Sequence, residues 1–153
     1  MRSLLALVFA FALLFAANDN LVAETPRATA DEAKAMVARA IALYREKGPD
    51  EAFAMMNRGE AGFRDRELFI FAYGPDRKVV VQAAAPERVG LDADTIKDVD
   101  GKLYGVESLR VATPEGTWVD YKAINPVTGD TENKSSWLVR VDGYVFGCGV
   151  YRP

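Results

Sequence analysis

Hydrophobic residues recur every three or four positions between Thr29 and Gly48, and this spacing predicts an amphipathic helix. Thr29, with Glu32 three positions later, forms a capping-box signature at its start, and Gly48 followed by Pro49 ends it. The apolar stripe consists of Ala33, Met36, Val37, Ala40, Ile41, Leu43 and Tyr44. A stripe of this width has to pack against another element. A second, shorter helix is expected from Pro49 to about Asn57.

Alternating or continuous apolar runs predict five strands in the rest of the chain. They are expected at Leu68 to Tyr73, Val79 to Gln82, Thr117 to Ala123, Lys134 to Val141 and Tyr144 to Tyr151. Between the second and third strands, residues 83–101 are irregular and acidic, and a short helix is expected at residues 103–112. Strands joined as hairpins after an amphipathic helix predict an α+β domain, an antiparallel sheet with the long helix across one face.

The start of the chain has the layout of a secretory signal peptide. An unbroken apolar run at residues 4–17 follows a single positive charge and precedes polar residues. A helix over this run would be about 21 Å long, shorter than the roughly 30 Å hydrocarbon core of a bilayer. We therefore expect a signal peptide at residues 1–23, a short leader at 24–28 and one domain at 29–153, placed in the periplasm or secreted. An uncleaved membrane anchor is the weaker alternative.

The chain of 153 residues contains no histidine and one cysteine, Cys148. Without an imidazole, a Ser-His-Asp or Cys-His nucleophile, a histidine-ligated metal and an axial-histidine haem are excluded. One thiol cannot form a disulfide or a CxxC pair within the chain, and Cys148, between two glycines, is expected to be a buried, unreactive thiol. The net charge of −3 does not indicate nucleic-acid binding, which would require a basic patch for the phosphates. We expect no cofactor.

The last third of the chain contains several short motifs whose order along the sequence is informative. They are Gly116-Thr117-Trp118-Val119-Asp120-Tyr121, Asn125-Pro126-Val127-Thr128-Gly129, Lys134-Ser135-Ser136-Trp137 and Asp142-Gly143-Tyr144-Val145-Phe146-Gly147-Cys148-Gly149-Val150-Tyr151, with Asp98-Val99-Asp100-Gly101-Lys102 and Gly74-Pro75-Asp76 upstream. Over about residues 29–151 the sequence resembles the single Cache domain of the second type, an extracytoplasmic ligand-binding module with a PAS-like fold. The resemblance implies a five-stranded antiparallel sheet, the long helix behind it, and a pocket on the other face under the irregular segment. Such pockets commonly take small organic acids or similar metabolites.

The sequence departs from this family pattern in two ways. Members often have a histidine near the end of the second strand, where this chain has Gln82, so a polar contact there would be uncharged. Most relatives are the outer half of a chemoreceptor or kinase, whereas this sequence ends at Pro153 with no second membrane span or signalling domain, which suggests a standalone exported form. Because histidine is absent, ligand binding is expected to be nearly independent of pH between roughly pH 6 and 8.

Four residues are candidates for binding a small carboxylate, which needs a cation or hydrogen-bond donors and an apolar wall. In this hypothesis Lys134 neutralises the carboxylate, Tyr121 and Tyr73 donate hydroxyl hydrogen bonds, and Trp118 forms apolar wall, while residues 83–101 order over the site. Trp118 and Tyr121 are three positions apart, so an ideal strand points them to opposite faces and only one lines the pocket unless a bulge intervenes. The alternative stays open that Lys134 is a solvated edge charge and the aromatic residues belong to the core.

The acidic segment matches a calcium-binding loop only in part. With Gly101 on the conserved turn position of such a loop, Asp98, Asp100 and Glu107 fall on its third, fifth and twelfth positions, but Ile96 occupies the first. Without the lead carboxylate no metal site is expected, and a polar turn that caps the following helix is the better interpretation.

The sequence favours an exported, non-enzymatic domain that binds a short organic acid, with a membrane sensor protein as a possible partner. The domain is expected to be a monomer or a homodimer formed through its long helix. The alternative is a protein–protein interaction module that serves a membrane receptor or kinase without a ligand of its own, and it predicts an exposed apolar patch and a filled core in place of the pocket. An enzyme is the least supported class because the usual catalytic groups are missing.

Overall fold

The computed structural model describes residues 26–152, so the predicted signal peptide at residues 1–23 lies outside the described residues. The helices are α1 (Ala30–Lys47), α2 (Pro49–Asn57) and α3 (Tyr104–Val111), with short 3-10 turns η1 (Glu60–Gly62), η2 (Pro86–Arg88) and η3 (Ala93–Thr95). The strands are β1 (Arg64–Asp65), β2 (Leu68–Tyr73), β3 (Val79–Gln82), β4 (Thr117–Ile124), β5 (Thr131–Val141) and β6 (Tyr144–Arg152). The α+β class predicted from the sequence is confirmed.

All strand pairs of the sheet are antiparallel, and β6 lies at its centre between β2 and β5. The path β2-β6-β5-β4 continues at β2 into β3, while β1 pairs with the first residues of β2. The five predicted strands are therefore present, but the sheet has six because of β1. Arg64 and Asp65 form only a two-residue polar strand, which is too short to show an apolar period.

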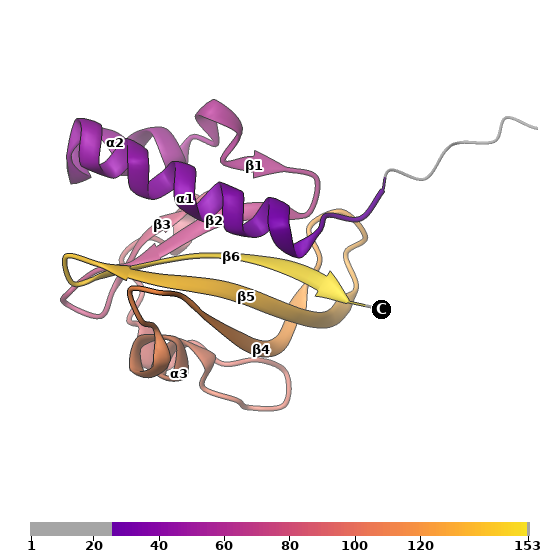
Figure 1. Cartoon of the computed structure of the whole chain (residues 1–153). Coiled ribbons are helices and arrows are strands. Elements are labelled where there is room, and N and C mark those ends of the chain that lie inside the picture. The colour runs from indigo at the N-terminus through magenta and orange to yellow at the C-terminus, as the bar shows by residue number, and fades with distance from the viewer. Residues whose placement is uncertain (1–25, 153) are drawn as a thin grey trace, which may run out of the picture.

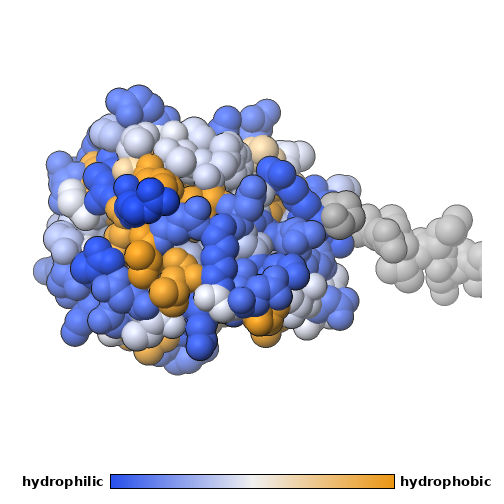
Figure 2. Space-filling view, turned by 90° about the horizontal axis from the view of Figure 1, so that it is seen from below, coloured by the Kyte–Doolittle hydropathy of each residue, from blue (hydrophilic) through white to orange (hydrophobic). Residues whose placement is uncertain are grey.

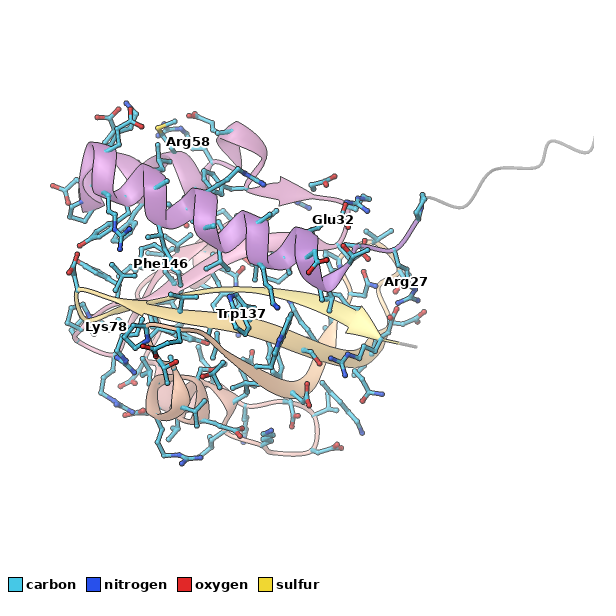
Figure 3. The ribbon with its side chains drawn as sticks, in the orientation of Figure 1. Arg27, Glu32, Arg58, Lys78, Trp137 and Phe146 are labelled. Carbon is cyan, nitrogen blue, oxygen red and sulfur yellow. The ribbon has the colours of Figure 1, made fainter. Side chains whose placement is uncertain are left out.

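Two layers cover the sheet, one on each face. The α1 and α2 helices lie across one face, and α3 lies with the irregular segment on the other (Figure 1). On the α1 side, Phe146 packs with Tyr44 and Phe53 at ring-centroid distances of 5.5 and 6.2 Å. Figure 3 shows Phe146 between the sheet and α1. We call residues 83–103 the roof segment, because they cover the face of the sheet that α1 leaves free.

The start of α1 follows the predicted capping box. The Thr29 hydroxyl accepts a hydrogen bond from the Glu32 amide at 3.3 Å, and the Thr29 amide donates to the Glu32 carboxylate at 2.7 Å. The buried residues of the helix are Ala33, Met36, Val37, Ala40 and Ile41. They are the core of the predicted stripe, so the long helix packs on the sheet through the face that its sequence pattern indicated.

Side chains of the turn between β1 and β2, and of β5, hold the leader that precedes α1. The Ala28 amide donates to the buried Glu67 carboxylate at 2.6 Å, and the Arg66 guanidinium donates to the Pro26 carbonyl at 3.1 Å. Arg27 forms an ion pair with Glu132, near the start of β5, at 2.6 Å. The leader and the end of β6 therefore lie at the same end of the sheet (Figure 1).

Cys148 points from β6 to the α1 side, where its sulfur lies 3.5 Å from that of Met36. It is fully buried, and burial raises the pKa of its thiol to about 12. A thiol in this environment is protonated and shielded at neutral pH, which agrees with the unreactive role expected from the sequence.

A candidate ligand-binding cavity under the roof segment

A cavity of about 380 Å³ lies between the roof segment and the sheet face opposite α1. Strands β2, β4, β5 and β6 supply its floor through Phe69, Phe71, Tyr73, Tyr121, Lys134 and Tyr151. The roof segment and the first residue of α3 close it from the other side with Arg88, Ile96, Asp98, Val99 and Tyr104. A partly enclosed, mostly aromatic cavity with a few polar groups is typical of small-molecule sites.

Lys134 is the most unusual side chain of the floor. It is only 1% exposed, and its ammonium lies 3.7 Å from the centroid of the Phe69 ring and 4.7 Å from that of Tyr151. Its hydrogen-bond partner is the Tyr151 hydroxyl at 3.4 Å, and within residues 26–152 it pairs with no carboxylate. Burial lowers the pKa of Lys134 to about 7. A desolvated cation without a counter-charge is ready to bind an anion.

Gly149 on β6 makes room for this lysine. A Cβ atom at position 149 would lie 2.4 Å from both Lys134 Cε and Ser136 Oγ, and 3.0 Å from a backbone oxygen. Gly147, two residues earlier on the same face, makes room in the same way for the Phe71 ring. The two glycines of β6 therefore let side chains of the neighbouring strands lie across the central strand of the floor.

Two stacked tyrosines form one wall of the cavity. The Tyr121 ring stacks on Tyr104 with a centroid distance of 4.0 Å and an interplanar angle of 5°. The Tyr121 hydroxyl shares a hydrogen bond of 2.8 Å with Ser136, and burial raises its pKa well above the ordinary value. Tyr73, 3% exposed, lines the cavity as well, and desolvation raises its pKa. Both hydroxyls stay protonated at neutral pH, and they remain hydrogen-bond donors.

Trp118 does not line this cavity. It pairs across strands with Trp137, their ring centroids lie 5.3 Å apart, and Lys34 of α1 lies over both rings. Trp118 thus lies on the α1 side, and its expected role as a pocket wall is corrected. The alternation along β4 is regular, so Tyr121, three positions on, takes the opposite face. The structure brings Lys134, Tyr121 and Tyr73 together and leaves Trp118 out.

Asp98 fastens the roof segment to the edge strand β4. Its carboxylate accepts hydrogen bonds from the backbone amides of Asp100 at 3.0 Å, Lys102 at 2.9 Å and Lys122 at 3.1 Å. These bonds, that from Lys122 first, lower the pKa of the carboxyl group. The helix-capping role expected for this polar turn is wrong, because α3 begins after Leu103 with no side-chain cap. Within the described part of the chain, no three Asp, Glu, Cys or His residues form a group suited to a metal ion.

Several residues that line the cavity were not identified from the sequence, among them Phe69, Arg88, Tyr104 and Tyr151. Phe69 belongs to a strand whose six residues are all buried, so no alternation marks its inner face. Arg88 lies in a segment without period, and nothing in the sequence of residues 83–101 marks Arg88 or Lys97, the two basic residues of this acidic stretch, as a cavity residue.

The lysine also changes the expected pH dependence. The missing histidine suggested flat binding between roughly pH 6 and 8. A lysine whose pKa is about 7 titrates within that range, so the expectation is corrected. In the empty cavity the cation that would attract a carboxylate is present below pH 7 and lost above it.

No protein-family model and no curated protein sequence matches the chain. Its fold, however, matches solved structures. A methyl-accepting chemotaxis protein from Vibrio parahaemolyticus RIMD 2210633 superposes with a TM-score of 0.65 at 16% identity, covering 79% of this chain and 86% of that one. A Cache chemosensory domain described for its recognition of carboxylic acids superposes with a TM-score of 0.61 at 19% identity, covering 80% of this chain and 88% of that one. A periplasmic sensor domain of a chemotaxis protein superposes with a TM-score of 0.59 at 20% identity, covering 80% of this chain and 90% of that one.

The chain has the fold of Cache chemosensory domains, which confirms the fold that its sequence motifs implied. A shared fold at such identities leaves function to the residues of the site. No helix within residues 26–152 has the length and apolar character needed to cross a membrane.

Proposed function

We propose that this protein is a non-enzymatic sensor domain, exported to the periplasm or its equivalent, that binds a short carboxylic acid under the roof segment. Lys134 neutralises the carboxylate, the hydroxyls of Tyr73 and Tyr121 lie within the same cavity as donors, and Phe69 and Tyr104 provide apolar wall. The observation that carries the proposal is Lys134 itself, a cation 1% exposed at the cavity floor without a carboxylate partner among residues 26–152. One of the fold neighbours is described as recognising carboxylic acids, which supports the same ligand class.

Such a lysine makes physical sense as a ligand group. Burying an unpaired charge is costly, and the cost is recovered when an anion enters and supplies the missing counter-charge. The amine is also excluded from water, so a charge-assisted hydrogen bond to a carboxylate is stronger here than at the surface. A purely structural lysine would instead be expected to pair with a carboxylate of the protein.

Thermal unfolding with a panel of short acids tests the proposal. An acid at one hundred times its dissociation constant adds about 2.7 kcal/mol to the free energy of unfolding. Propionate should raise the melting temperature and propionamide, which has the same shape without the charge, should not. Lys134→Met should lose the response. The proposal fails if no acid in a broad panel shifts the transition, or if Lys134→Met responds as the wild type does.

The interaction-module alternative predicted a filled core and an exposed apolar patch. The cavity of about 380 Å³ is against the first expectation. The second has some support, since Val89, Leu91, Val99 and Leu103 of the roof segment are exposed, and Figure 2 shows hydrophobic side chains gathered on the face viewed from below, the roof side. Co-purification of a membrane receptor or kinase that survives Lys134→Met would favour this alternative over the acid sensor.

A further inference from the structure

The cavity holds a second cation that the proposed function leaves unused. Arg88 ends η2 in the roof segment, is half-buried, and lines the cavity together with Lys134. Within residues 26–152 it forms no ion pair with a carboxylate. Its charge acts on cavity groups: it contributes, after burial, to lowering the pKa of Lys134, and it opposes the rise that burial imposes on the pKa of Tyr104. A ligand with one carboxylate would neutralise only one of these two cations.

Gln82 adds a hydrogen-bond acceptor to the same cavity. Its Oε1 atom is the buried side-chain oxygen or nitrogen within residues 26–152 that has no hydrogen-bond partner. The backbone around it is fixed, because the Gln82 amide donates to Asn57 Oδ1 at 2.8 Å and Asn57 Nδ2 donates to the Val80 carbonyl at 3.0 Å. A buried acceptor on a fixed frame costs free energy unless a ligand donates to it.

The strand register sets the distance that a ligand has to span. Gln82 is paired with Phe71 on β2, and the Lys134 ammonium lies 3.7 Å from the ring of Phe69 on the same strand. Phe69 and Phe71 are two positions apart and share a face, so the two polar groups lie beside neighbouring inward-facing positions of β2, whose Cα atoms are roughly 7 Å apart. A small ligand whose carboxylate binds Lys134 can therefore also place a hydroxyl group near Gln82.

We propose that the ligand is a short dicarboxylate that carries a hydroxyl group. One carboxylate binds Lys134, the second binds Arg88, and the hydroxyl donates to Gln82 Oε1. This inference rests on the proposed function and makes it more specific. Because Arg88 belongs to the roof segment, the second carboxylate also links the roof to the floor, and a ligand with only one carboxylate does not.

Calorimetric titration of the purified protein with three four-carbon acids tests the inference. Succinate should bind at least about tenfold more tightly than butyrate, since the charge-assisted bond to Arg88 is added. Malate, which adds a hydroxyl group to succinate, should gain about a further tenfold through Gln82. Arg88→Gln should reduce the ratio of succinate to butyrate affinity to about one, and Gln82→Met should remove the preference for malate over succinate. Circular dichroism confirms that each variant is folded.

The outcomes separate this inference from the proposed function. If butyrate binds as tightly as succinate and Arg88→Gln changes neither affinity, the dicarboxylate inference is overturned while the acid-sensor proposal stands. If succinate is preferred but malate is not, or Gln82→Met leaves a malate preference intact, the role of Gln82 is overturned. If none of the three acids binds wild-type protein and no shorter acid does, the proposed function fails and the inference falls with it.

Discussion

Replacing Lys134 with methionine should stabilise the empty protein and abolish its binding of carboxylates. Methionine is unbranched, has a similar length and needs no counter-charge, so it fits the space that the lysine occupies. The lysine is 1% exposed, and burial lowers its pKa to about 7, from 10.5 for a freely solvated side chain. The wild type therefore keeps a residue that lowers its stability in the absence of ligand.

The sign and size of the effect follow from proton linkage. The folded-state pKa lies below the unfolded value, so the penalty is fully present below pH 7 and disappears as the pH rises to 10.5. At about 1.4 kcal/mol per pKa unit its upper limit near pH 7 is about 4 kcal/mol. The cation–π contact of the Lys134 ammonium with the Phe69 ring, at 3.7 Å, stabilises the folded protein by about 1–2 kcal/mol, and methionine does not make this contact. We expect a net gain of about 2 kcal/mol at pH 7.

Urea unfolding from about pH 6 to pH 10 measures this gain as a shift in midpoint at constant slope. Lys78→Met is the matched control, because Lys78 is an exposed lysine and its replacement should change the free energy of unfolding by no more than about 0.5 kcal/mol. The reasoning is refuted if Lys134→Met is less stable than the wild type at pH 7, or if the difference between them stays constant up to pH 10.

Further predictions concern the cavity, the two faces of the sheet and the roof segment. Propionate affinity should fall about tenfold from pH 6 to pH 8, because a group with a pKa of about 7 loses its proton over this range; equal calorimetric affinities would contradict it. Gly149→Ala should weaken propionate binding at least about tenfold by displacing Lys134, while Cys148→Ala, on the other face, should stay within about twofold of wild type. Trp118→Leu should also bind within about twofold, and a larger loss would place Trp118 in the cavity. Asp98→Ala should speed amide hydrogen exchange at Lys102 and Lys122 by about tenfold or more, and unchanged exchange would show that Asp98 does not fasten the roof.

Local sequence signals predicted the scaffold well because they act within a few residues. Thr29 and Glu32 cap the first helix through atoms three positions apart, so the capping box identified its start. The turn at Asp142 and Gly143 joins β5 to β6 as expected, with both residues at positive φ. The two-residue β1 was missed because its pairing depends on β2 and leaves no pattern in its own sequence.

The site was harder to predict because it depends on which face of each strand is used. Alternation showed that Trp118 and Tyr121 point in opposite directions, but only the packing of Trp137 and Lys34 decides that Trp118 faces α1. Arg88 lines the cavity because the backbone of the roof segment passes over the sheet at this point. The composition of residues 83–101 does not predict the course of that backbone.

The positions of Pro26 and Arg152, the first and last described residues, have a mechanical consequence. The leader is held at the end of the sheet where β6 finishes, and Lys134 is paired with Tyr151 in the second-to-last residue pair of the β5–β6 ladder. Tension that pulls Pro26 and Arg152 apart would open this ladder pair by pair from its end instead of shearing many hydrogen bonds at once. Lys134 is then among the first residues of the cavity floor to move. A ligand bound to Lys134 therefore raises the force needed to separate Pro26 and Arg152, and tension between these two residues lowers the affinity for the ligand.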